Sequence, residues 1–203
     1  MRAGRGKVPG GQVAEAVVGG YRRLVDELTA LLVRAKDGDS EAFGAFVHST
    51  YPSIWRLCSY LVGLDDADDA TQETFLAAWR SSSSFRGDSS ARTWLFVIAR
   101  RCADRVASKQ QRCLGIPDDA QLHVSALSPE AAAVTGDLLQ RLPLERRTAL
   151  VLTQVIGLTY EEAAAVCDCA VGTIRSRVAR ARKELLDQTA VTSGRGMDAR
   201  YGT

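Results

Sequence analysis

The last third of the chain has a pattern that few folds satisfy: three consecutive helical segments separated by short turns. Within residues 138–186, a long amphipathic segment ends at Gly157, a short helical segment follows, and a second turn leads into a basic segment. Helices in this order form a helix-turn-helix preceded by a support helix. This part of the chain is therefore predicted to be all-α.

The final segment, which begins near Val171, combines an apolar stripe with a cationic face. The stripe consists of Ile174, Val178, Ala181 and Leu185. The residues opposite the stripe are Thr173, Ser176, Arg180 and Lys183, and those that flank it are Arg175, Arg177 and Arg182. A helix of this kind, without a carboxylate from Cys169 to Lys183, can lie in a DNA major groove. A solvated surface helix is the alternative, but the preceding turn and short helix favour DNA binding.

The composition shows that the chain as a whole is not strongly basic. The chain has 203 residues and a formal net charge of only +2, so any DNA affinity must come from local segregation of charge. The five cysteines are an odd number and do not form a secretory disulfide framework. No apolar run is long enough to cross a bilayer, and there is no signal-peptide core. We therefore expect a cytoplasmic protein without membrane insertion.

Glycine- and proline-rich breaks divide the chain into two helical domains joined by a flexible linker. The expected parts are a flexible N-terminal extension (1–27), a first helical domain (28–111), a linker (112–134), a second helical domain (135–187) and a C-terminal tail (188–203). Apolar residues at helical spacing also predict a helix over 13–35. The chain shows no strand pattern, so the predicted fold class is all-α.

The first domain is predicted to contain three further helices. The first two cover roughly Glu41–Val62 and Ala67–Trp79, with a break at Gly63, and Pro52 is expected to kink or divide the first of them. A polar connector then leads to a helix that runs from about Ala91 to Lys109, with Ser90 as its expected cap.

Acidic residues crowd the start of the helix near residue 67. They are Asp65, Asp66, Asp68, Asp69 and Glu73, and no basic residue lies between Leu57 and Trp79. The helix dipole explains two or three of them. The remainder indicate a surface for a cationic protein partner. A metal site is a weaker third interpretation, because side chains on a helix do not converge as those of a dedicated loop do. We predict no metal and no cofactor.

The next helix reverses the sign of the charge. Its region contains Arg86, Arg92, Arg100, Arg101, Arg105, Lys109 and Arg112, opposed only by Asp88 and Asp104. Phe85, Trp94 and Phe96 are interleaved with these cations. Arginines beside aromatic rings can hold phosphates and stack unpaired bases, and the polar loop before the helix could accept a flipped base. Two roles are open for Trp94: its ring could stack on an unpaired base, or it could belong to the buried apolar side of the helix.

Three motifs in this order resemble the extracytoplasmic-function sigma factors of bacterial RNA polymerase. They are DDADDATQETFLAAW at 65–79, SSARTWLFVIARR at 89–101 and LTYEEAAAVCDCAVGTIRSRVARARKEL at 158–185. The resemblance implies that the first domain (sigma region 2) binds the clamp of the largest polymerase subunit and melts the minus-ten element. It implies that the second domain (sigma region 4) reads the minus-thirty-five element and contacts the flap of the second-largest subunit. It also implies an anti-sigma protein as a partner.

The resemblance also assigns individual residues. Those implied for core polymerase binding are Asp66, Asp69, Gln72, Glu73 and Phe75, with Trp79 in the core. Those implied for minus-ten DNA are Ser83, Phe85, Arg86, Ser89, Arg92, Trp94, Arg100, Arg101 and Arg105. Those implied for minus-thirty-five DNA are Tyr160, Thr173, Arg175, Ser176, Arg177 and Arg180. The family usually has Asn where Arg101 stands, and Asp one position after Asp104.

The predicted function is a promoter-specificity subunit that has no catalytic activity of its own. No catalytic constellation is present in the sequence. The alternative is a stand-alone helix-turn-helix regulator, which would leave the acidic and basic helices of the first domain without a role. A third interpretation is an interaction protein that sequesters a partner, which predicts no dependence on DNA. A redox or zinc role for Cys167 and Cys169 is a minor alternative, because two thiolates do not complete a tetrahedral site.

Overall fold

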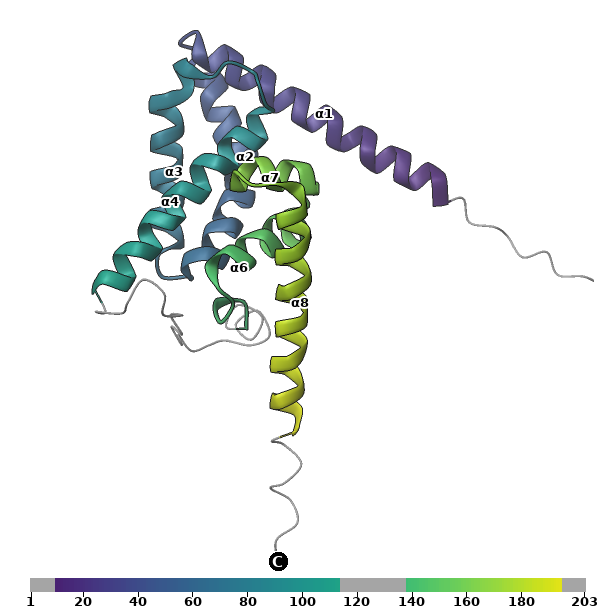
Figure 1. The fold of residues 1–203 in the computed structure, drawn as a ribbon. Helices are drawn as coiled ribbons and strands as arrows, with labels where there is room; N and C mark the ends of the chain where they lie inside the picture. Colours follow the sequence, from purple (N-terminus) through teal and green to yellow (C-terminus); the bar gives the residue numbers. More distant parts are fainter. Residues whose placement is uncertain (1–9, 114–137, 195–203) are drawn as a thin grey trace, which may run out of the picture.

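A computed structural model of the chain describes residues 10–113 and 138–194, which form helices and turns with no β-strand among them. The elements are α1 (Gly10–Lys36), α2 (Ser40–Val62), α3 (Ala67–Ser81), η1 (Ser82–Ser84), α4 (Ala91–Cys113), α6 (Leu144–Leu150), η2 (Val151–Val155), α7 (Tyr160–Cys167) and α8 (Val171–Gly194). Elements α1 to α4 form one helical domain, and α6 to α8 form a second (Figure 1). The predicted all-α fold with two helical domains is confirmed.

Local capping explains where several helices begin and end. The Asp39 side chain accepts a hydrogen bond from the backbone N–H of Ala42 at 2.9 Å and so starts α2. Gly63, with φ +91°, ends α2 in a conformation that disfavours a side chain. The Ser90 hydroxyl accepts from the backbone N–H of Thr93 at 3.1 Å, which confirms the predicted cap of α4.

Pro52 does not divide α2, which is continuous from Ser40 to Val62. A proline within a helix removes one donor and leaves the carbonyl four residues earlier without its partner. Here both Pro52 and His48 are exposed, so water can hydrate that carbonyl. The cost of the missing bond is therefore small enough for the packing of α2 to outweigh it.

Two predicted boundaries differ from the observed elements, and the linker lies mostly outside the described residues. Helix α1 begins at Gly10, so the boundary expected between residues 27 and 28 falls inside a helix. Helix α8 continues to Gly194, beyond the expected end near Asp187, since no proline interrupts that stretch. Most of the expected linker, from residue 114 onward, lies outside the described residues.

The support helix of the helix-turn-helix is shorter than the single long segment predicted from its periodicity. Helix α6 starts only at Leu144, because Pro143 precedes it in an extended conformation (ψ 137°) and a proline disfavours the helical region for the residue before it. It continues into η2, a turn of π-helix, and the chain then reverses at Gly157, where φ is +78°.

Each domain has a centre of buried apolar side chains. In the first domain, α2 packs against α1, α3 and α4, and Phe46, Ile54 and Leu57 are fully buried. In the second domain, α6 and α7 pack on α8 through Ile174 and Val178, two members of the predicted apolar stripe, which are at most 1% exposed. The predicted stripe of α8 is therefore confirmed as the face that holds this helix in place.

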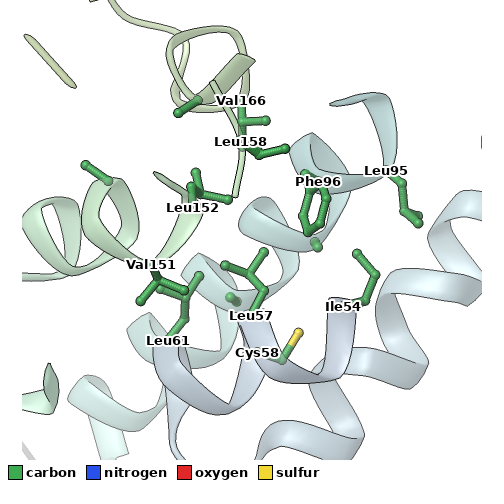
Figure 2. Close-up of a cluster of buried hydrophobic side chains, with 14 of the residues drawn as sticks. Ile54, Leu57, Cys58, Leu61, Leu95, Phe96, Val151, Leu152, Leu158 and Val166 are labelled. Carbon is green, nitrogen blue, oxygen red and sulfur yellow. The ribbon is translucent and has the colours of Figure 1, made fainter. Parts of the chain in front are cut away.

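The two domains also pack directly against each other, which the sequence did not indicate. Figure 2 shows Leu57 and Leu61 of α2 and Phe96 of α4 directed toward the second domain, where Val151 and Leu152 face them. All five side chains are at most 1% exposed. Helix α4 lies against α7, and α2 lies against α6. The described residues therefore share one continuous apolar core across both domains.

Candidate nucleic-acid interface

The outward face of α8 is polar and cationic. The exposed residues Gly172, Arg175, Ser176, Ala179, Arg180 and Lys183 recur at helical spacing on one side. Arg182, Leu186 and Asp187 of α8 are exposed as well. The carboxylate nearest this face in sequence, Glu184, turns back to Arg146 of α6, with 2.8 Å between the charged atoms. The face is therefore open to solvent and carries positive charge from Arg175 to Lys183, and the exposed Asp187 lies one turn beyond it.

Two flanking arginines of α8 are bound within the second domain. Arg177 donates to Glu145 of α6 at 2.6 Å, and its side chain is 22% exposed. Arg182 donates to the side-chain oxygen of Gln154 at 2.6 Å. Of the residues assigned to minus-thirty-five DNA, the structure places Arg175, Ser176 and Arg180 on the open face. Thr173 and Tyr160 are half-buried, and Arg177 is directed toward α6.

The turn that positions α8 is specified by local chemistry. Helix α7 begins with a reciprocal capping box: the Thr159 hydroxyl accepts from the N–H of Glu162 at 3.1 Å, and the Glu162 carboxylate accepts from the N–H of Thr159 at 2.8 Å. It ends at Asp168, which has φ +51°, a left-handed conformation that Asp and Asn adopt more readily than most residues. This ending turns the chain into α8.

One side of the basic helix α4, which carries Arg92 and Arg100, faces the second domain. Arg92 donates to the carbonyl oxygen of Ile156 at 3.0 Å, and Arg100 donates through Nε to the carbonyl oxygen of Val166 at 3.0 Å. Arg100 also pairs with Asp104 at 3.0 Å, where burial raises the pKa of the carboxyl and the nearby guanidinium opposes that shift. Two arginines assigned to minus-ten DNA therefore donate hydrogen bonds to backbone carbonyl oxygens of the second domain.

Other residues assigned to minus-ten DNA lie in different surroundings. Arg101 is exposed, and Arg105 pairs with Glu73 of α3 at 3.1 Å. The pair joins one residue assigned to DNA with one assigned to polymerase. Both side chains are about half exposed, so water weakens their attraction.

The loop before α4 is held from inside by an aromatic pair. Phe85 is 3% exposed, and its ring meets the edge of Trp94 at a centroid distance of 5.5 Å. The Lys36 ammonium at the end of α1 donates to the Phe85 carbonyl oxygen at 3.1 Å. Ser83, Arg86 and Ser89, the other assigned residues of this loop, are exposed. The buried aromatic pair thus supports a loop that presents polar side chains outward.

The exposed face of α3 combines acidic and apolar side chains. Asp69, Gln72, Leu76 and Trp79 lie along one side of the helix and are all exposed. The prediction that Trp79 belongs to the core is wrong: its side chain is 45% exposed, and only one edge packs on Phe43, at a centroid distance of 4.8 Å. Isolated exposed apolar residues are common, but several side by side indicate an interaction surface.

Sequence reasoning missed Leu76 as a surface residue. It is 48% exposed and continues the spacing of Asp69 and Gln72 along α3. Following the helical period from those two polar residues would have identified it. The remaining assigned residues of α3 are more enclosed: Asp66 is half-buried, and Phe75 stacks on Tyr51 with ring centroids 6.0 Å apart.

The Cys167 thiol lies at the junction of the two domains and is unreactive by its surroundings. Burial raises its pKa to about 11, and Arg100 and Arg177 oppose that shift. Since thiolate is the reactive form, a thiol with a pKa of about 11 is only about one-thousandth ionised at about pH 8. We expect Cys167 to be alkylated about a hundredfold more slowly in the native protein than in urea. Equal rates, measured by tandem mass spectrometry that locates the label on Cys167 rather than on Cys169 of the same tryptic peptide, would contradict this partial burial.

The described residues offer neither a grouped set of metal ligands nor a helix suited to a membrane. Within residues 10–113 and 138–194, no three His, Cys, Asp or Glu side chains are grouped so that they could hold a metal ion. In the same part of the chain, no helix combines the length and the apolar character that a membrane span requires.

Comparison with known proteins matches both domains. Residues 46–113 match the family described as Sigma-70 region 2, and residues 134–185 match Sigma-70, region 4. The chain is 43% identical over 169 residues to the ECF RNA polymerase sigma factor SigC of Mycobacterium tuberculosis, covering 79% of this chain and 90% of the relative. It is 34% identical over 180 residues to the ECF RNA polymerase sigma-E factor of Escherichia coli K12, covering 80% and 93%.

Solved structures of similar fold agree with these matches. The sigma factor RpoE of Bartonella quintana, in complex with the anti-sigma factor NepR, aligns with a TM-score of 0.64 at 31% identity, over 73% of this chain and 97% of that one. CnrH, in complex with the cytosolic domain of CnrY, aligns with a TM-score of 0.65 at 25% identity, over 81% and 98%.

The chain combines a helix-turn-helix domain that has an open cationic face with a helical domain that has its own acidic and basic helices. This combination is that of a promoter-binding protein. The chain belongs to the extracytoplasmic-function (ECF) sigma factors of RNA polymerase. It directs promoter recognition for transcription initiation. Sigma factors are in general not enzymes, and the predicted resemblance to this family is confirmed.

Proposed function

We propose that three surfaces divide the work of promoter recognition. The exposed face of α3 binds the clamp of the largest polymerase subunit through Asp69, Gln72, Leu76 and Trp79. Helix α4 and the loop over residues 82–90 bind the melted minus-ten strand. The open face of α8 reads the minus-thirty-five duplex through Arg175, Ser176 and Arg180, while the rest of the second domain contacts the flap.

The single observation that carries this proposal is the segregation of charge on α8. Its inward side is apolar, its flanking arginines are paired within the domain, and Arg175 and Arg180 remain exposed. Arginine can donate two hydrogen bonds to guanine in the major groove, and lysine supplies phosphate attraction. A helix that is held by its apolar stripe and presents such donors fits a duplex groove.

Run-off transcription tests the proposal directly. Purified core RNA polymerase would be supplied with genomic promoter fragments, with and without this protein. We expect transcripts that appear only when the protein is added, and their aligned start sites would reveal both promoter elements. Specific retention of duplex DNA by the protein alone, without any transcript, would instead support a stand-alone helix-turn-helix regulator.

Partners and location follow from the same assignment. One structural neighbour is a complex with the anti-sigma factor NepR, and the other is a complex with the cytosolic domain of CnrY. The first of these complexes supports an anti-sigma protein as a partner of this chain. We place the protein in the cytoplasm because RNA polymerase acts there on the chromosome. Its contribution to initiation is binding free energy at protein and DNA surfaces, so we assign it no catalytic step of its own.

A further inference from the structure

Helix α1 holds the loop over residues 82–90 at two points. Lys36, in the last turn of α1, donates from its ammonium to the Phe85 carbonyl oxygen at 3.1 Å. The Thr29 hydroxyl accepts a hydrogen bond from the backbone N–H of Ala91 at 3.2 Å. Ala91 is the first residue of α4, so the two contacts lie at either end of the exposed part of the loop, residues 86–89.

Both contacts come from one face of α1. Thr29 and Lys36 are seven residues apart, which is close to two helical turns, so they share a face and lie about 10 Å apart along the helix axis. The chain from Phe85 to Ala91 is six residues long and would span about 20 Å if it were fully extended. The loop between the two contacts is therefore bowed outward, which fits the exposure of residues 86–89.

Phe85 is the fixed point at the first end of this bow. Its ring is 3% exposed and packs on Trp94, and its backbone N–H donates to the Ser82 carbonyl oxygen at 3.0 Å. Its carbonyl oxygen is the group that the exposed Lys36 binds. Since the ring and the N–H are already held, the Lys36 ammonium supplies the remaining restraint on the direction in which the chain leaves Phe85.

Hydrogen bonds to the first turn of α4 hold the other end of the loop. The first N–H groups of a helix have no acceptor within that helix. The Ser90 hydroxyl satisfies the N–H of Thr93, and the Thr29 hydroxyl satisfies that of Ala91, a fully buried residue. The Thr29 hydroxyl also donates to the Val25 carbonyl oxygen at 2.9 Å, which fixes its orientation. Without this hydroxyl the buried N–H would lose its acceptor, and the start of α4 would open more readily.

We propose that Thr29 and Lys36 are positioning residues that preform the loop over residues 82–90 for the base it captures, an inference that rests on the proposed function of this loop. A loop that is ordered before binding loses less conformational entropy when it binds. A rigid loop also discriminates better, because it cannot rearrange around the wrong base. Helix α1, which contains none of the residues that the resemblance assigns to DNA, thereby influences which base is preferred.

Two pairs of substitutions in the full chain separate the hydrogen bonds from the space that the side chains fill. Lys36→Met and Thr29→Val remove the bonds and keep the approximate shape, whereas Lys36→Arg and Thr29→Ser keep a donor or an acceptor. Arg23→Met is the matched control, because it removes an exposed cation of α1 that pairs with Glu27 on the same helix. Circular dichroism verifies folding, and if Thr29→Val loses helix content, the substitution of the exposed Lys36 decides the outcome.

Cleavage by trypsin after Arg86 in the native protein reports the state of the loop without any DNA. The Arg86 side chain is 84% exposed, so the cleavage rate depends on how readily the loop backbone opens. We expect cleavage of Lys36→Met and Thr29→Val to be roughly three- to tenfold faster than that of wild type, measured by mass spectrometry of the fragment that begins at Gly87. The conservative variants and the control should be cleaved at about the wild-type rate. An unchanged rate in folded Lys36→Met or Thr29→Val would overturn the role of that residue.

Base preference is then measured with the complex of core RNA polymerase and this protein. A promoter found by run-off transcription is prepared with each of the four bases at the minus-ten position that wild type discriminates most strongly. We expect the ratio of transcripts from the preferred and the least preferred base to fall roughly three- to tenfold in Lys36→Met and Thr29→Val, and to recover in Lys36→Arg and Thr29→Ser. Affinity for core polymerase should not change. Faster cleavage with an unchanged ratio would overturn the influence of α1 on base preference.

The salt dependence of promoter affinity distinguishes positioning from direct contact with DNA. A lysine bound to a phosphate adds about one to the slope of the logarithm of affinity against the logarithm of salt concentration. A positioning role predicts an unchanged slope in Lys36→Met, whereas a slope reduced by about one with an unchanged base ratio would assign Lys36 to a phosphate and overturn the proposal. Absence of any transcript with wild type would contradict the proposed function itself, and trypsin cleavage would still decide whether α1 holds the loop.

Discussion

A protein that carries Asp69→Lys and Leu76→Asp is expected to lose at least about a hundredfold in affinity for core RNA polymerase. Both side chains lie on the exposed face of α3, and Leu76 is 48% exposed. Central apolar contacts contribute most of the binding energy at protein interfaces, and a reversed charge facing a cationic partner repels it. Measurement of the dissociation constant by biolayer interferometry tests this expectation.

The same double substitution should leave the fold intact. Neither side chain fills the core, and Asp69 contributes only a helix-dipole interaction of about 0.3–1 kcal/mol near the start of α3. The matched control is Asp65→Lys, which reverses an exposed acid just before α3 but outside that face. Wild-type affinity in the double variant, or equal loss in Asp65→Lys, would contradict the assignment of this face to polymerase.

Replacing Arg175 and Arg180 with alanine should weaken binding to the minus-thirty-five duplex by roughly thirty- to a hundredfold. These are the two exposed arginines of the open face of α8, so each can reach a base edge or a phosphate. The dependence of the logarithm of affinity on the logarithm of salt concentration should also decrease in slope by about two, because two fewer phosphate or base contacts form.

Arg182→Ala is the matched control for this second prediction. It removes one cation from the same helix, but its exposed guanidinium is hydrogen-bonded to Gln154. Titration of a promoter duplex by fluorescence anisotropy at several salt concentrations compares the variants. An effect of Arg182→Ala on affinity and slope as large as that of the double variant would mean that α8 attracts DNA only by overall charge.

The sequence-based assignment and the structure differ at Arg177. The resemblance assigns it to minus-thirty-five DNA, yet its side chain is bound to Glu145 of α6. It lies beside the apolar stripe, where helical geometry allows a side chain to turn either toward the groove or toward its own domain. The periodicity of α8 could not decide between these directions, and the position of Glu145 in the folded domain does.

Much of the architecture could be read from residue patterns. Apolar residues at a period of 3.6 specify helices, and glycine, proline and polar caps specify where they stop, so α2, α3, α4, α7 and α8 were predicted near their observed positions. Gly63, Ser90 and Gly157 acted as expected. The longer reach of α8 was missed because a helix end without proline or a strong cap has a weak local signal, whereas α1 differs from the predicted 13–35 by only a few residues.

The sequence by itself determined the helices, the two domains and the segregation of acidic and basic surfaces, since these depend on side-chain type and spacing. Only the tertiary structure decided that Arg92, Arg100 and Arg147 bind backbone carbonyls across a shared core. Every residue has a carbonyl group, so no sequence pattern marks which one will accept a hydrogen bond from a distant arginine. Which carbonyl accepts is decided only when folding brings the ends of α2 and α7 against the other domain.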